Sequence, residues 1–282
     1  MKFYLEDFNN MLPVARIPDE DLFNAMQHEI EMKFNLVRRL IGQSLYDQLS
    51  DLDVRVSDFN DDNDIAVELA KAVKRFVGTA AFHDILPQVD LVLTSTGFGV
   101  VSNQNVAPAS VERVERLRQQ LHEASLNYLD YMLDYARHFE IFKESEGWRL
   151  YLNTFFWNHR QCPMLGNPNG TRDYLDSLRP AIAEAEASVR ILISPEFFLE
   201  LLNAERTASA TSIQEMAIDF VRKAVAAVVT KSPMAKTMAR TLLSFLDEQL
   251  EHFPTYANST AYQSNHFKPH ENDKDDPCFI FA

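Results

Sequence analysis

Residues 41–49 read Ile-Gly-Gln-Ser-Leu-Tyr-Asp-Gln-Leu, and 152 positions later residues 193–201 read Ile-Ser-Pro-Glu-Phe-Phe-Leu-Glu-Leu. Both stretches carry apolar residues at the first, fifth, sixth and ninth positions, as on one face of a short helix. At the same offset, the apolar pattern also matches back to residue 22 without a gap. The match predicts two related helical segments, over 22–49 and 174–201.

Two further helices repeat in the same order at shorter offsets. Residues 70–75 match 218–223, and residues 108–121 match 233–246. Any two amphipathic helices can be aligned, but three matches in one order indicate an internal duplication. The predicted domains are a first helical copy over 1–145, an aromatic and Gly/Pro-containing linker over 146–170, a second helical copy over 171–254 and a tail over 255–282.

The composition indicates a folded, mainly α-helical protein. Hydrophobic residues make up 46% of 282, with 20 Phe but only 7 Gly. The formal charge of −14 disfavours binding to nucleic acid or anionic membranes, because both need clustered Lys and Arg. Without a long apolar run or a cysteine framework, we expect a cytoplasmic protein with no membrane span and no sequence-specific nucleic-acid binding.

Apolar residues at helical spacing predict the helices of the first copy. We expect helices over 19–40, 43–49 and 64–85, and a long helix over 111–143. In the long helix, apolar and tyrosine residues alternate at spacings of three and four, which is a heptad-like seam. Such a seam either packs within a bundle or forms a coiled coil with another subunit.

The second copy carries helix-start signals at matching places. Ser194 offers a capping hydroxyl and Pro195 suits the first helical position. Thr211 and Gln214 form a capping-box pattern before the next helix. In the helix that precedes these two, Pro180 predicts a kink or a later start.

Residues 88–107 break the helical pattern. Val89–Thr94 and Phe98–Ser102 read as two strands joined by a turn. The second copy has no counterpart, so a β-hairpin is expected in the first copy alone. A two-stranded hairpin is only marginally stable by itself, so it packs either on this chain's own helices or on a partner. The residues expected at such a contact are Leu91, Leu93, Phe98, Val100 and Val101.

Two other segments are candidate contact surfaces. An aromatic run begins at Trp148 and ends at Trp157. It either packs in the core between the copies or forms a partner-binding patch. The tail ends in an apolar, strand-like stretch, which fits docking onto an open sheet edge of this chain or of a neighbour. The tail residues expected at this contact are Phe279, Ile280 and Phe281.

The acidic loop 58–64 mimics the start of an EF-hand calcium loop. Its Asp and Asn residues alternate as oxygen ligands would. However, Asn63 stands where the loop needs Gly, and Leu69 stands where a bidentate Glu is required. We therefore expect a solvated loop in which Asp64 caps the following helix.

Two histidine motifs were weighed as chemical sites. His159-x-x-Cys162 pairs a thiol with a base, but the sequence shows no third member and no oxyanion site. His266-x-x-x-His270 has metal-like spacing, but Pro269 prevents a regular helix from aligning the rings. A metal-dependent hydrolase is disfavoured because the spacings of these histidines and of the cysteine do not bring together enough side chains to bind a metal ion. We predict no catalytic, cofactor-binding or metal-binding residue, and hence a protein that is not an enzyme.

The order helix, short helix, acidic loop, helix, hairpin and long helix over 19–143 resembles the head–tail connector, or adaptor, proteins of tailed phages. Residues 91–110, with Thr-Gly-Phe-Gly-Val-Val-Ser-Asn and Ala-Pro-Ala-Ser, are similar to prophage-encoded proteins of gut bacteria. The resemblance extends more weakly over 171–252. It implies a non-enzymatic virion assembly protein that joins a ring beneath the portal and contacts its neighbours through helices, loops and termini.

Two features of this chain depart from that family, namely the second helical copy and the aromatic linker. They leave the number of subunits in a ring open. The alternative is a monomeric helical scaffold of the bacterial cytoplasm that binds a protein or peptide. Either function makes other proteins the expected partners, including further copies of the chain.

Overall fold

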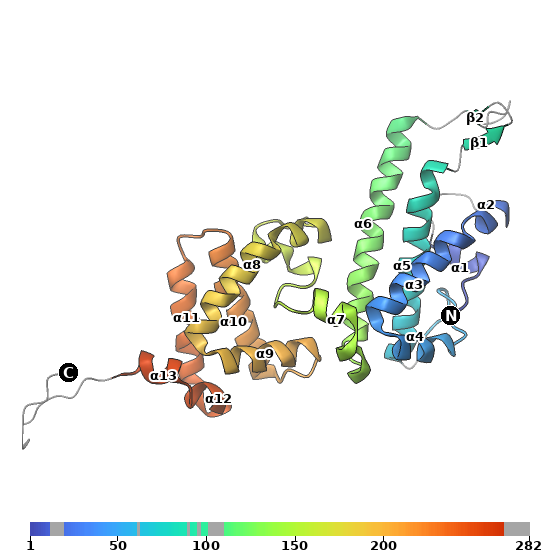
Figure 1. Ribbon diagram of the computed structural model, residues 1–282. Helices are drawn as coiled ribbons and strands as arrows, with labels where there is room; N and C mark the ends of the chain where they lie inside the picture. The colour runs from blue at the N-terminus through green and yellow to red at the C-terminus, as the bar shows by residue number, and fades with distance from the viewer. Residues whose placement is uncertain (12–19, 61–62, 89–90, 95–96, 101–109, 268–282) are drawn as a thin grey trace, which may run out of the picture. The chain divides into compact units, whose positions relative to one another are not determined.

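The computed structural model is mainly α-helical, as the composition and the apolar spacing predicted (Figure 1). Its residues form two compact units, Met1–Ser177 and Leu178–Ala282. The division falls within helix α8 (Arg172–Ile193), whereas the sequence placed it in the linker 146–170. The structure describes residues 1–11, 20–60, 63–88, 91–94, 97–100 and 110–267.

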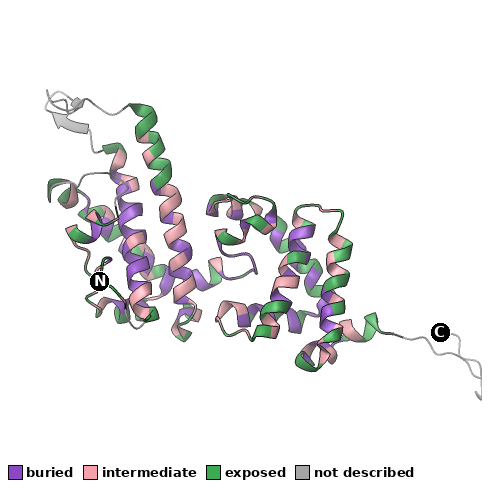
Figure 2. Cartoon of the chain, turned by 180° about the vertical axis from the view of Figure 1, so that it is seen from behind, coloured by how far each residue is buried: buried purple, intermediate pink, exposed green. Residues whose placement is uncertain are grey.

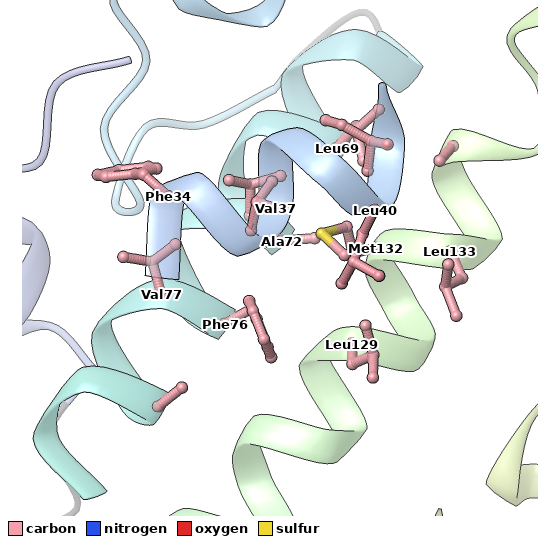
Figure 3. Close-up of a cluster of buried hydrophobic side chains, with 14 of the residues drawn as sticks. Phe34, Val37, Leu40, Leu69, Ala72, Phe76, Val77, Leu129, Met132 and Leu133 are labelled. Atoms are coloured by element: carbon pink, nitrogen blue, oxygen red, sulfur yellow. The ribbon is translucent and has the colours of Figure 1, made fainter. Parts of the chain in front are cut away.

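Helix α5 (Ile65–Ile85) is the central helix of the first unit. It begins where the Asp64 carboxylate accepts a hydrogen bond from the Ala66 amide at 2.8 Å, as predicted. Helices α3 (Gln27–Ile41) and α6 (Val111–Ala136) both pack against α5, and α5 is therefore buried along most of its length. The side chains that meet between these helices include Phe34, Val37, Leu40, Leu69, Ala72, Phe76, Val77, Leu129, Met132 and Leu133 (Figure 3).

The structure corrects two helix predictions in the first unit. The helix expected over 19–40 is two helices, α2 (Glu20–Ala25) and α3. The helix expected over 111–143 ends at Ala136, and a 3₁₀ segment follows. In that segment, Phe142 is fully buried and packs edge-on against Trp148, with ring centroids 6.0 Å apart. The remaining short segments are α1 (Leu5–Asn9), α4 (Gln43–Ser50), α7 (Glu146–Tyr151) and 3₁₀ turns at Leu86–Gln88, Glu140–Glu144 and His159–Leu165.

Two short strands lie between α5 and α6 in the chain. β1 (Leu91–Thr94) and β2 (Gly97–Val100) pair antiparallel, with Leu91 opposite Val100 and Leu93 opposite Phe98. These strands lie within the predicted segment 88–107. Residues 89–90, 95–96 and 101–107 of that segment lie outside the described residues.

In the second unit, α9 (Pro195–Arg206) and α11 (Ala235–Glu248) both pack against α10 (Ser212–Val229). The predicted caps are confirmed: Ser194 Oγ accepts from the Phe197 amide at 3.1 Å, and Thr211 forms a capping box with Gln214. α8 runs through Pro180 without a break in its assignment. Further short helices are α12 (Pro254–Ala257) and α13 (Thr260–Asn265), at the start of the predicted tail 255–282.

The residues that join α3 to α4 and α8 to α9 share an unusual backbone conformation. Gly42 has φ 87° and ψ 147°, and Ser194 has φ 85° and ψ 142°. This region is normally occupied by glycine and costs other residues about 1–3 kcal/mol. At both junctions one residue, rather than a loop, redirects the chain into the next helix.

Candidate interaction surface

Helices α5 and α6 pack against each other as a pair, which we call the α5–α6 platform, and the chain passes from one to the other through the hairpin segment (Figure 1). Helix α6 begins at a Ser110 cap, whose Oγ accepts from the Arg113 amide at 3.4 Å. No residue over 111–120 is buried, and burial begins at Leu121 (Figure 2). The first turns of α6 are therefore an exposed surface next to the point where the hairpin is attached.

The pairing register divides the hairpin residues between two faces. Leu91 is opposite Val100, and Leu93 is opposite Phe98. Because residues on one face alternate along a strand, these four apolar residues share a face. The sequence had assigned all four as contact residues. Val101, the fifth, lies outside the described residues.

An open hollow of about 650 Å³ lies beside the exposed turns of α6. Two ion pairs run along its wall: Glu112 with Arg116 at 3.2 Å, and Glu115 with Arg118 at 3.8 Å. These opposite charges neutralise each other along the helix. The other lining residues are His83 from α5 and Gln119 and His122 from α6.

The aromatic run is core rather than surface, which corrects the partner-patch hypothesis. Trp148 is 8% exposed and Trp157 is 3% exposed. Phe155 and Phe156 are also buried, and the Arg137 guanidinium lies 5.1 Å from the Trp157 ring centroid. These side chains bury their large apolar area inside the molecule, so they offer no exposed aromatic patch to a partner.

A buried polar network, which the sequence analysis missed, holds the aromatic linker in the first unit. Asp130 of α6 forms an ion pair with Arg172 at the start of α8. Its other oxygen accepts from the backbone amide of His159 at 2.8 Å and from the His159 ring. Arg172 also donates to the Trp157 carbonyl at 2.6 Å. The available signal was Asp130, which lies among apolar and tyrosine residues of α6.

The network supplies a carboxylate beside His159, yet Cys162 is unsuited to be a nucleophile. The thiol is fully buried. Burial and the Asp130 carboxylate raise the pKa of Cys162 to about 11, so the reactive thiolate is scarce near neutral pH. A Cβ added at Gly170 would lie 2.5 Å from the Cys162 Cβ. The side chain fills a tightly packed position.

In the described part of the acidic loop, polar side chains bond to neighbouring groups of the loop and of α5. Asp58 accepts from the Arg55 amide at 2.6 Å. Asn60 bonds to the backbone of Asp64 and to the Glu68 carboxylate. These are helix-start and turn contacts, as expected for a capping loop. Residues 61–62 lie outside the described residues.

The other candidate positions fall near the C-terminus. His266 stacks on Tyr262, with ring centroids 4.1 Å apart, and its Nε2 lies 3.2 Å from Asp247. His270, Phe279, Ile280 and Phe281 lie outside the described residues. Where the structure describes the chain, it contains no group of three or more His, Cys, Asp or Glu side chains placed to hold a metal ion.

A family of unknown function (DUF6712) matches residues 37–147. The match begins within α3, contains α4, α5, the hairpin and α6, and ends within α7. It covers less than half of the chain. No curated protein and no solved structure matches the chain. Among the described helices, none is both long and apolar enough to cross a membrane.

Proposed function

We propose that the chain is a non-enzymatic structural protein of a phage-derived assembly, with a role like that of a head–tail connector. It acts in the host cytoplasm during assembly and then in the virion. Its partners are proteins, either further copies of the chain in a ring or a portal-like ring. The observation that carries this proposal is the two-stranded hairpin that connects the packed helices α5 and α6 in the chain.

The hairpin suits contact with another chain for two reasons. The described sheet has only β1 and β2, so the outer edge of each strand offers backbone donors and acceptors. Such edges bind an added strand from a partner. The strands also carry the apolar residues Leu91, Leu93, Phe98 and Val100, and apolar residues gain stability when a partner covers them.

We also infer that the two helical halves arose by duplication, which gives one chain two similar helical surfaces for assembly. The junctions at Gly42 and Ser194 lie 152 positions apart and have nearly the same φ and ψ. Burial repeats at that offset on both sides of the junction. The corresponding buried pairs are Ile30 and Ile182, Val37 and Val189, Ile41 and Ile193, Leu45 and Phe197, and Leu49 and Leu201.

Cations at equivalent positions support the same inference. Lys74 of α5 donates to the Val54 carbonyl, just beyond α4. At an offset of 148, Arg222 of α10 lies 2.6 Å from Glu205 near the end of α9. In the first half, α5 therefore contacts the loop that follows α4. In the second half, α10 contacts the last turn of α9.

The test begins with the genes beside this one, which are examined for portal, terminase and capsid proteins. The native chain and a variant, in which a flexible Gly/Ser segment of equal length replaces residues 91–100, are then each co-expressed with the adjacent portal protein. Light scattering gives the size of the complexes. We expect the native chain to co-purify with the portal and the replaced chain to remain free, because the contact strands are gone.

Met216→Ser is the matched control, because Met216 is an exposed apolar residue (50%) on α10, in the second unit and not in the hairpin. This variant is expected to bind as the native chain does. Equal binding by the hairpin-replaced chain would contradict the proposed contact. The alternative, a monomeric helical scaffold, would be favoured if the native chain does not bind the portal, stays monomeric and binds another protein or peptide.

A further inference from the structure

We propose that His83 and His122 bind one borderline divalent cation, Zn²⁺, Ni²⁺ or Cu²⁺, between α5 and α6. His83 lies near the C-terminal end of α5, and His122 lies on α6 just past its exposed turns. Their ring centroids are 5.5 Å apart and their planes are tilted by 43°. Neither ring is fully buried, with side-chain exposures of 21% and 43%.

The ring separation matches two imidazoles on one metal ion. A tetrahedral Zn²⁺ holds each ligand nitrogen at about 2.0–2.1 Å, which places the centroids of two bound imidazoles roughly 5 Å apart. The observed 5.5 Å is close to that value. Small rotations of the two rings therefore suffice to bring one nitrogen of each onto a shared ion.

Each ring has one nitrogen within hydrogen-bond distance of a carboxylate. His83 Nδ1 lies 2.8 Å from Asp84 Oδ1, and His122 Nε2 lies 2.8 Å from Asp173 Oδ2. Asp84 is in turn paired with Lys33. Metal-binding histidines characteristically donate their second N–H to a carboxylate, which fixes the tautomer and increases the basicity of the ligand nitrogen.

This arrangement assigns the ligand atoms. With these nitrogens donating to the carboxylates, the lone pairs remain on Nε2 of His83 and Nδ1 of His122. Neither atom has a hydrogen-bond partner within the described part of the chain. Imidazole nitrogen favours Zn²⁺, Ni²⁺ and Cu²⁺ over Mg²⁺ and Ca²⁺, which prefer oxygen. The site should therefore select borderline metals.

The surroundings admit an ion and its water ligands. Both histidines line the open hollow beside the first turns of α6. The two arginines on its wall are paired with Glu112 and Glu115, which reduces their repulsion of a cation. Because the described residues add no further ligand to the group, water completes the coordination. A bound ion would join α5 to α6 next to the hairpin.

The test titrates ZnCl₂, NiCl₂ and MgCl₂ into the full chain by calorimetry. We expect one Zn²⁺ or Ni²⁺ per chain, no Mg²⁺, and a rise in the thermal midpoint with Ni²⁺ that EDTA reverses. His83→Gln and His122→Gln should each abolish measurable binding. Asp173→Asn should weaken it about tenfold, because it removes a carboxylate behind a ligand.

His266→Gln is the matched control, since His266 is also half-exposed and paired with a carboxylate, Asp247. This variant should bind metal as the native chain does. Unchanged affinity in His122→Gln would overturn the proposal, and so would loss of binding in His266→Gln. Melting curves without metal identify any variant that fails to fold. Should His83→Gln unfold, His122→Gln decides the question, because His122 is the more exposed of the two.

Discussion

At the scale of single residues, a buried ion pair fixes the N-terminal segment of the first unit. Asp7 is fully buried and Lys74 is 1% exposed, with Nζ 3.0 Å from Oδ2. Asp7 also accepts from the amides of Tyr4 and Val56, and Lys74 donates to the Val54 carbonyl. The pair therefore joins α1 to α5 and to the loop before it, with its polar groups satisfied.

Removing one partner of this pair should be costly. Asp7→Asn leaves the Lys74 charge buried without a counter-ion, and we expect the free energy of unfolding to fall by about 3–5 kcal/mol. The double variant Asp7→Asn with Lys74→Met removes both charges and should recover part of this loss. Urea denaturation of the single and double variants measures the coupling. Strictly additive losses would contradict a direct interaction.

Acid stability depends in part on Asp84. Burial raises the pKa of this carboxyl, but hydrogen bonds from Lys33 and His83 outweigh burial and lower the pKa below its ordinary value of 3.8. The unfolded chain therefore binds the proton more readily. The stabilising contribution is complete above the unfolded pKa and is lost as the pH falls through the folded pKa.

Asp84→Asn should consequently be less stable than the native chain at pH 7, and the difference should shrink below about pH 4. Thermal midpoints at pH 7 and pH 3, both in EDTA, check this expectation. A difference that stays constant between the two pH values would show that the loss comes from packing and not from ionisation.

At the scale of elements, the junctions before α4 and α9 carry opposite combinations of strain and capping. Gly42 adopts its positive φ without a side chain, but it supplies no cap. Ser194 accepts a strained φ and caps the Phe197 amide at 3.1 Å. A Cβ at residue 42 would lie 3.7 Å from Ser145 Cβ, which is ordinary contact. A side chain at residue 42 therefore meets no steric clash, and substitutions there measure the cost of the positive φ alone.

Substitutions at the two junctions should follow this difference. Ser194→Ala keeps the strain and loses the cap, so the free energy of unfolding should drop by about 0.5–2 kcal/mol. Ser194→Gly should cost less, because it also removes the strain. Gly42→Ala should destabilise by about 1–3 kcal/mol, and Gly42→Ser by less, because Ser can cap as Ser194 does. Urea midpoints rank the four variants. Equal losses of stability in Gly42→Ala and Gly42→Ser would show that a serine at residue 42 does not cap α4.

At the scale of the whole molecule, the first unit is held together by side chains far apart in sequence. Asp130, His159 and Arg172 meet in one buried network. Both tryptophans of the chain, Trp148 and Trp157, lie in this unit. Tryptophan fluorescence therefore reports on the first unit alone, whereas far-ultraviolet circular dichroism reports on the helices of both.

Asp130→Asn removes the buried carboxylate partner of the fully buried Arg172 and leaves it only Asp176, which is 40% exposed and lies 3.3 Å away, so it should destabilise the first unit by about 3–5 kcal/mol. We expect the fluorescence midpoint to move to a lower urea concentration. Part of the helical signal in circular dichroism should still be lost at the urea midpoint of the native chain, because the second unit is unchanged. Asp173→Asn, at an exposed position next to Arg172 on α8, is the control and should shift fluorescence little. Identical shifts in fluorescence and dichroism would indicate that the two units unfold together.

The sequence by itself determined the positions and starts of the principal helices. Helical spacing and caps are local, so Asp64, Ser194 and Thr211 were identified as caps without knowledge of the fold. The junction at Gly42 was marked by a glycine between two apolar helical runs. The break in helical spacing after α5 marked the segment that contains β1 and β2.

Only the tertiary structure decided which side chains meet. It buried Trp148 and Trp157, ended α6 at Ala136, and brought His83 beside His122. It also paired Asp7 with Lys74 and Asp130 with Arg172. These partners lie tens of residues apart, and their contact depends on how whole helices pack. Local propensity sets where a helix begins, whereas burial against distant elements decides what each of its faces contacts.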